Sequence, residues 1–130
     1  MVTSRRLEAL DYELLLSSLQ KDKYHRDTTT MFFVEPKTIC NVYEDTSGPI
    51  LFLRGKAEGT TLRLDIQFVS NDDHRRNLKA MVIGFPLLVE NARQSGFEKV
   101  YFESETPALV AFSQKRLGFV ATGRILERVI

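Results

Sequence analysis

The spacing of apolar residues changes once along this chain, and that change constrains the fold more than any other feature. From 60 to 70 apolar and polar residues alternate, which is typical of a strand with one face in a core. From 78 to 92 the apolar residues recur every three or four positions, which indicates an amphipathic helix. A strand, a helix and a second strand allow a right-handed crossover and a locally parallel pair. The sequence therefore predicts an α+β fold with a mixed sheet.

Four runs rich in β-branched and aromatic residues precede that helix. They are residues 31–35, 38–44, 49–55 and 60–70. Turn-forming segments separate them, at 35–37, 45–48 and 56–59. Because such short connections join antiparallel strands, the sequence predicts an antiparallel meander over about 31–70.

Helices are expected on both sides of this meander. Leucines at helical spacing predict an N-terminal helix at about 4–20. The stripe from 78 to 92 continues in phase across Pro86, which predicts one kinked helix ending at Gly96; a helix that begins at Pro86 is the alternative.

The C-terminal part, about 98–130, is predicted to add a strand, a helix and a hairpin. Residues 99–103 form the strand, and Ser104 or Thr106 caps a helix with Pro107 in its first turn. That helix ends near Gly118, and residues 119–121 and 124–130 form the hairpin.

Composition narrows the class of protein. The 130 residues are 43% hydrophobic and 27% charged with a net charge of +1, which favours one domain over 1–130 and argues against nucleic acid and membrane surfaces as partners. No signal peptide is expected at the N-terminus, so the expected location is cytoplasmic. The lone Cys40 excludes an internal disulfide and is interpreted as a small core residue, and no spacing suggests a metal site.

Residues 62–120 resemble the core of the GCN5-related N-acetyltransferase superfamily. In that family a strand leads into a loop of the form Arg/Gln-x-x-Gly-x-Gly/Ala that opens a helix, and two helices end in Gly-Phe. Here the loop reads His-Arg-Arg-Asn-Leu-Lys-Ala at 74–80, and the two endings are Gly96-Phe97 and Gly118-Phe119. With the meander, the resemblance covers the C-terminal three-quarters of the chain. It implies a three-layer α/β/α architecture with a mainly antiparallel sheet.

The resemblance implies transfer of an acetyl group from acetyl-CoA to an unidentified amine. Amides at the N-terminus of a helix, helped by cations, bind the diphosphate of the coenzyme. Arg75 matches the basic position of the loop and Ala80 the final small one, whereas Leu78 replaces the central glycine. A solvated turn neutralised by Asp72 and Asp73 is the alternative for this basic cluster. The expected coenzyme-binding residues are Phe68, Val69, Ser70, Arg75, Arg76, Asn77, Leu78, Lys79 and Ala80.

The backbone N–H of Phe68, Val69 or Ser70 is expected to polarise the thioester carbonyl. Asp65 and Glu103 are the candidate general bases, and each is also an ordinary solvent-facing strand residue. The family's catalytic Tyr on the last helix is replaced by Phe112 or Gln114, Ser113 beside them is a poor proton donor, and Glu105 replaces the family's Asn. His25 is interpreted as a surface connector residue.

Two functions therefore stay open from the sequence. One is an acyl-CoA-dependent N-acetyltransferase whose short N-terminal region leaves either a small acceptor site or one completed by a second subunit in a homodimer. The other is a catalytically inactive protein of the same fold that acts as a ligand-binding or protein-interaction module, which Leu78, Glu105 and the missing Tyr favour.

Overall fold

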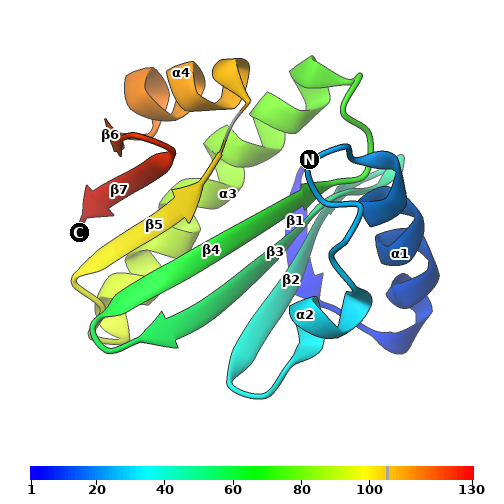
Figure 1. Ribbon diagram of the computed structural model, residues 1–130, viewed down its shortest axis with the longest axis horizontal. Coiled ribbons are helices and arrows are strands. Elements are labelled where there is room, and N and C mark those ends of the chain that lie inside the picture. The colour runs from blue at the N-terminus through cyan, green and yellow to red at the C-terminus, as the bar shows by residue number, and fades with distance from the viewer. Residues whose placement is uncertain (105) are drawn as a thin grey trace.

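The computed structural model describes residues 1–104 and 106–130 and has one seven-stranded sheet with helices on both faces (Figure 1). The strand order is β1-β2-β3-β4-β5-β7-β6, and only β4 and β5 pair in parallel among the described strands. The predicted mixed α+β fold is confirmed. The strands are β1 Thr3–Arg6, β2 Thr38–Asp45, β3 Gly48–Glu58, β4 Thr61–Phe68, β5 Lys99–Glu103, β6 Val120–Thr122 and β7 Ile125–Val129. The helices are the short 3-10 helix η1 Ala9–Asp11, α1 Tyr12–Lys21, α2 Thr30–Val34, α3 His74–Gln94 and α4 Pro107–Arg116.

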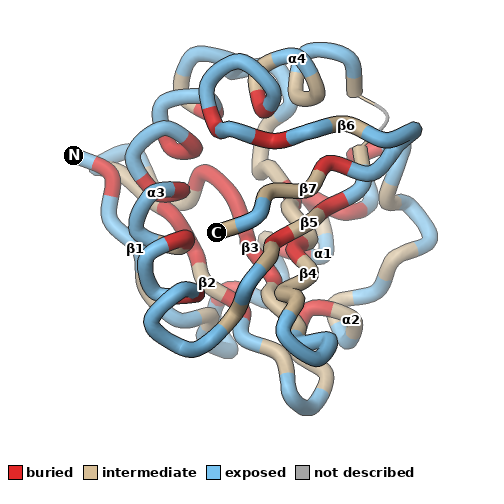
Figure 2. Tube along the Cα trace, turned by 90° about the vertical axis from the view of Figure 1, so that its left-hand side faces the viewer, coloured by how far each residue is buried: buried red, intermediate tan, exposed pale blue. Residues whose placement is uncertain are grey.

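The two faces of the sheet carry separate apolar cores. Alternation along β3 sends Leu51 and Leu53 to the core under α3, and Phe52 to the core under α1 and α2. The predicted alternation of β4 is confirmed, because Leu64 is buried on the α3 side. Figure 2 shows the buried segments gathered between the layers, with the exposed ones on the outside.

The helix α3 runs without interruption through Pro86, as the unbroken apolar stripe predicts. It ends at Gln94, two residues before Gly96, whose φ of 91° is in the left-handed region that favours glycine. The Phe97 amide then donates to the Ala92 carbonyl at 3.0 Å, and the Phe97 ring packs on the core. Gly96-Phe97 is thus a helix stop that folds an aromatic ring back onto the sheet.

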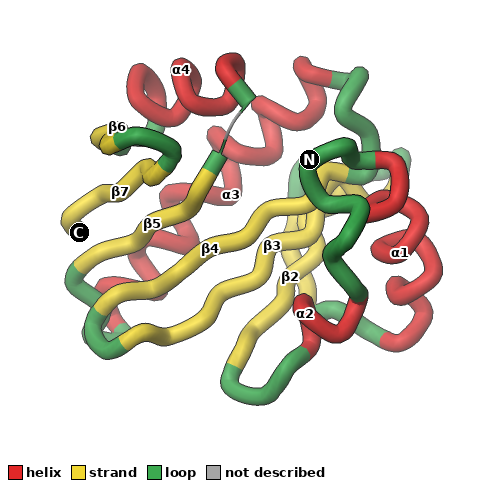
Figure 3. The backbone as a smooth tube through the Cα atoms, in the orientation of Figure 1, coloured by secondary structure: helices red, strands yellow, loops and turns green. Residues whose placement is uncertain are grey.

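The strands β4 and β5 stay together for only three residues. Their parallel pairs are Thr61 with Lys99, Leu62 with Val100 and Arg63 with Tyr101. Beyond these pairs the two strands diverge toward the end of β4, as Figure 3 shows. The sheet is therefore splayed at the edge where α3 begins.

The predicted N-terminal helix over 4–20 is wrong in its first half. Residues 3–6 form the edge strand β1, and the helix α1 begins only at Tyr12. Arg5 donates two hydrogen bonds to the Asp11 carboxylate, at 2.7 and 2.8 Å, and a third to Glu44 at 3.0 Å. Pairing with β2 and these ion pairs override the leucine spacing, and Leu10 is 90% exposed.

The predicted strand at 31–35 is also wrong, because residues 30–34 form the short helix α2. The segment is rich in aromatic residues because Phe33 is buried in the core under α1 and α2, and not because it forms a strand. The antiparallel meander therefore contains β2, β3 and β4, and β1 supplies the fourth neighbouring strand. The turn predicted at 56–59 lies partly inside β3, which extends to Glu58.

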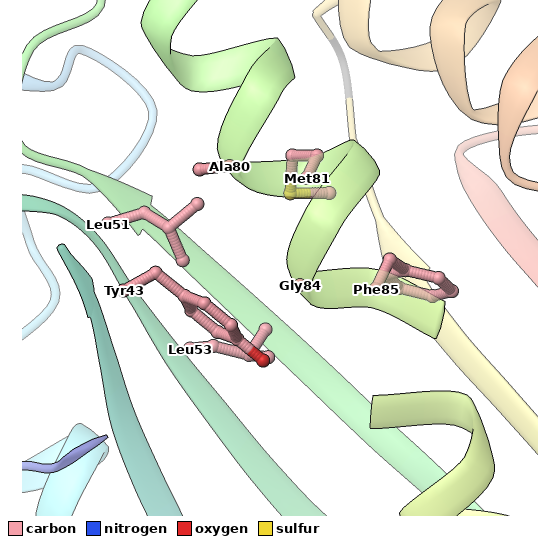
Figure 4. A pocket seen from close by; sticks show the side chains of 7 residues that line it. All are labelled: Tyr43, Leu51, Leu53, Ala80, Met81, Gly84 and Phe85. Carbon is pink, nitrogen blue, oxygen red and sulfur yellow. The ribbon is translucent and has the colours of Figure 1, made fainter. Parts of the chain in front are cut away.

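A small apolar cavity of about 10 Å³ lies between α3 and the sheet (Figure 4). It is lined by Tyr43, Leu51, Leu53, Ala80, Met81, Gly84 and Phe85. A Cβ atom at Gly84 would lie 2.4 Å from Cε1 of the Tyr43 ring. The close approach of helix and sheet therefore requires glycine at this position.

We expect Gly84→Ala to destabilise the protein by about 1–3 kcal/mol, because the added methyl group overpacks the contact with Tyr43. Urea unfolding measures this change. Ile83→Ala, on the exposed side of the same helix, is the control and should stay within about 0.5 kcal/mol of the wild type. In a Tyr43→Leu background the cost of Gly84→Ala should fall; an unchanged cost would show that the ring is not the obstacle.

Candidate functional site

The gap between the diverging ends of β4 and β5 is called the splay. The end of β4 and the start of α3 lie at its open end, which is called its mouth. Side-chain and backbone contacts fix the five-residue connection between them. The Asn77 amide nitrogen donates to the Ser70 carbonyl at 2.7 Å, and Asn77 is 7% exposed. The predicted loop residues Asn77 and Ser70 are thus brought together, and their contact positions the start of the helix.

The first turn of α3 offers two unpaired amides. The Asp73 carboxylate caps the helix by accepting from the Arg76 amide at 3.3 Å. The amides of His74 and Arg75 form no hydrogen bond within the described part of the chain. Two N–H groups and the positive end of the helix dipole therefore face the mouth of the splay, beside the carboxylate of Asp73.

The two arginines of the predicted loop have different environments. The Arg76 guanidinium donates to the Asp45 carboxylate at 2.9 and 2.7 Å and to the Gly48 carbonyl at 2.7 Å. It is thus bound to the turn between β2 and β3, and it holds the pKa of Asp45 well below its ordinary value. Arg75 and Lys79 are exposed and form no ion pair with another described residue.

Leu78 and Ala80 lie one turn further along α3. Ala80 is 1% exposed and packs on the sheet, as a small residue at this position must. Leu78, at the position of the family's central glycine, is 36% exposed and points away from the main core. Its side chain therefore borders the solvent side of the first turns of α3.

The amides at the end of β4 alternate in direction. The Val69 amide donates to the Ile50 carbonyl at 2.9 Å and so faces β3. Hydrogen-bonding positions alternate along an antiparallel pair, so the Phe68 amide, paired in register with Leu51, faces the opposite edge. That edge borders the splay. Among the predicted carbonyl donors, strand geometry therefore directs the Phe68 N–H toward the splay. The Val69 N–H points the other way, toward β3.

The two carboxylates predicted as bases lie on opposite sides of the splay. Asp65, on β4, accepts from Arg54 at 2.7 Å and from Arg63 at 3.4 Å. Glu103, the last residue of β5, is exposed and stands opposite Ile125 of β7. The structure therefore places Asp65 in an ion-pair cluster and leaves Glu103 facing solvent.

The helix α4 carries no phenol near the site. Phe112 is half-buried against the main core, and Gln114 is exposed. The Ser113 hydroxyl between them is buried and has no hydrogen-bond partner among the described residues. Glu105 lies outside the described residues.

Sequence reasoning missed a polar cluster on the other face of β4. His25, expected to be only a surface connector residue, contacts the buried Gln67 through Nδ1 at 2.5 Å. The same ring nitrogen lies 3.4 Å from the Asp22 carboxylate. The alternation of Gln67 with apolar residues identified it as the polar side of the strand, but nothing in the sequence indicated that α1 and the next segment would cover it.

No group of three or more His, Cys, Asp or Glu that suits a metal ion occurs among residues 1–104 and 106–130. Within the same residues, no helix is both long and apolar enough to cross a membrane. Cys40 is buried on β2, as predicted, and burial raises the pKa of its thiol to about 12.

We expect Arg76→Gln to raise the pKa of the Asp45 carboxyl to its ordinary range, because the paired guanidinium is removed. Since the folded pKa is lowered, the pair stabilises the protein above about pH 4 and loses this effect as pH falls through the folded pKa. The wild type should therefore lose more stability in acid than the variant. Carboxyl titration by NMR and acid unfolding measure both effects. Arg75→Gln is the matched control, and an equal shift there would refute the assignment.

No protein-family model matches the chain, and no curated protein matches it either. Solved structures match it over nearly its full length. The ribosomal-protein-S18-alanine N-acetyltransferase from Escherichia coli has a TM-score of 0.76 and 17% identity, covering 100% of this chain and 94% of that one. An aminoglycoside acetyltransferase in complex with coenzyme A has a TM-score of 0.73 and 12% identity, covering 99% and 95%.

A third structure, the PaiA N-acetyltransferase from Thermoplasma acidophilum in complex with coenzyme A, has a TM-score of 0.64 and 15% identity, and covers 100% of this chain and 99% of that one. Identities this low establish a shared fold and nothing finer. This chain therefore shares its fold with these N-acetyltransferases, which confirms the fold that the resemblance to the GCN5-related N-acetyltransferases implied.

Proposed function

We infer that the protein is an acyl-CoA-dependent N-acetyltransferase that transfers an acetyl group from acetyl-CoA to an amine. One observation carries this proposal: β4 and β5 separate after three pairs, and the Phe68 amide faces the gap beside the first turn of α3. A thioester in that gap meets an N–H donor, and a diphosphate at its mouth meets the start of a helix.

The residues at the mouth fit the diphosphate of the coenzyme. The amides of His74 and Arg75 form no hydrogen bond with another described residue, and the exposed side chains of Arg75 and Lys79 add two positive charges. Arg76 forms an ion pair with Asp45, so its role is to stabilise the turn between β2 and β3 and not to bind phosphate. Two of the structurally similar acetyltransferases were solved with coenzyme A, which supports a ligand of this class.

The chemistry needs little else from the protein. The amine attacks the thioester carbonyl, whose developing charge the Phe68 N–H stabilises, and the C–S bond breaks as the C–N bond forms. Asp65 is a poor candidate for the base, because two arginines hold its carboxylate as an ion pair. Glu103 is exposed at the end of β5 and stays a candidate.

Asp73 favours the second function, that of an inactive ligand-binding or protein-interaction module. Its carboxylate occupies the helix N-terminus and repels a second anion placed there. Coenzyme binding therefore requires this side chain to turn away or to be outweighed by Arg75 and Lys79. The balance between these charges sets the affinity for the coenzyme.

We expect acetyl-CoA to stabilise the protein, by roughly 2.7 kcal/mol at a concentration 100 times its Kd, and to be consumed when amines are added. Thermal shift and calorimetry measure binding. Release of the CoA thiol measures transfer to a panel of benzylamine, spermidine and a tripeptide with a free N-terminus. Binding without transfer would favour the inactive module, and no binding at millimolar acetyl-CoA would refute the proposal.

Two substitutions at the start of α3 should change acetyl-CoA affinity in opposite directions. Arg75→Ala removes a phosphate-binding cation and should weaken binding about tenfold. Asp73→Asn keeps a capping oxygen, removes the repelling charge, and should tighten binding several-fold at low salt. Calorimetry at two salt concentrations measures both changes. Glu90→Gln, far along the same helix, is the control; equal effects at Glu90 and Asp73 would place the ligand elsewhere.

A further inference from the structure

A buried glutamine on β4 sets the orientation of a histidine beside the splay. The Gln67 side chain is 0% exposed, and its NH₂ group points at three oxygens that only accept hydrogen bonds. These are the Phe68 carbonyl at 2.9 Å, the Asp22 carboxylate at 3.2 Å and the Ser18 carbonyl at 3.3 Å. The flipped amide would turn its oxygen toward all three, so the orientation of Gln67 is determined by its surroundings.

The orientation of Gln67 in turn fixes the proton on His25. The oxygen Oε1 of Gln67 lies 2.5 Å from Nδ1 of His25 and can only accept. Nδ1 must therefore carry a proton and donate it. In the neutral ring the lone pair is then on Nε2, and this nitrogen forms no hydrogen bond with any residue that the structure describes.

A second side chain contacts the ring. The Asp22 carboxylate, 7% exposed, lies 3.4 Å from Nδ1. The groups that face the ring from β4 and α1 are neutral, namely the Gln67 amide and the Ser18 carbonyl beyond it. On its own segment Lys23 and Arg26 are exposed, and Tyr24 is bound to Asp22 through its amide.

The position of the ring connects it to the proposed reaction. Gln67 immediately precedes Phe68, whose amide faces the splay, so His25 lies over the strand one residue away from the proposed carbonyl donor. In Figure 1 the segment between α1 and α2 passes in front of the sheet at the end where β4 finishes. The His25 side chain is 37% exposed, so the ring is in part accessible to solvent.

We propose that His25 is the general base that accepts a proton from the amine through Nε2, with Gln67 and Asp22 as its positioning residues. This inference rests on the proposed transferase function. As the amine nitrogen bonds to the thioester carbon, its proton moves to Nε2, and the electron pair of the C–S bond leaves with sulfur, which takes a proton from solvent. Imidazole suits this role because it ordinarily exchanges protons near neutral pH.

The tautomer is tested first and without any ligand. Nitrogen-edited NMR of the two imidazole rings in the full chain reports which nitrogen is protonated in the neutral form. His25 should carry its proton on Nδ1. His74, which is exposed and forms no hydrogen bond with another described residue, serves as the reference ring in the same sample. A proton on Nε2 of His25 would overturn the proposal.

Kinetics then separate a base from a structural residue. With acetyl-CoA and either water or the most reactive amine of the panel as acceptor, His25→Gln should lower kcat/KM by about 10²- to 10⁴-fold at pH 7. Its acetyl-CoA Kd, measured by calorimetry, should stay within about twofold. Arg26→Gln, on the same exposed segment, is the matched control and should keep the wild-type rate.

The pH profile gives a readout that a purely structural role would not change. The acidic limb of the wild-type kcat/KM should disappear in His25→Gln, because the proton-accepting ring is removed. Wild-type acetyl transfer that survives His25→Gln unchanged would overturn the base while leaving the transferase intact. Acetyl-CoA that does not bind, or that binds without release of thiol to amine or water, would overturn the transferase itself.

Discussion

The short parallel contact between β4 and β5 determines the rest of this architecture. β5 pairs with β7 along all five of its residues but with β4 along only three. Its last residues are therefore hydrogen-bonded to β7 on one edge and separated from β4 on the other. A parallel pair also needs a long crossover, and α3 supplies it with 21 residues, a helix of about 31 Å. The same crossover that makes the pair parallel brings the start of α3 back to the open end of the splay.

The face of the sheet opposite α3 is held by a buried charge. The Arg54 guanidinium is 1% exposed, and burial of such a group requires that its donors be satisfied. It donates to the Phe32 carbonyl at 2.7 Å and to the carboxylates of Asp65 and Glu35, and it stacks 3.9 Å from the Phe32 ring. Arg54 thus connects α2 with β3 and β4. One of its partners is Asp65, which the sequence suggested as a catalytic base.

Patterns that depend on local geometry were predictable from the sequence. The alternation of β4, the continuous stripe of α3 and the helix stops at Gly96 and Gly118 follow from backbone preferences, and the structure has all of them. The segments 3–6 and 31–35 were not predictable in this way. Edge pairing and the Arg5–Asp11 contact decide the first, and burial of Phe33 together with the contact of Arg54 with Phe32 decides the second. Both depend on residues far away in the sequence.

The same distinction applies to the site. The loop motif marked the region where α3 begins, but residues 74–80, predicted as a loop, are already helical. The motif also did not distinguish Arg75 from Arg76, whose partner Asp45 is 31 residues away. Asp65 resembled a free base on its strand until Arg54 was placed beside it. His25 resembled a connector residue until Gln67 was placed beneath it, 42 positions along the chain. A polar side chain acquires its chemical role from the donors and acceptors that the fold brings to it, so for the proposed transfer reaction the contacts of Gln67 carry more information than the loop motif does.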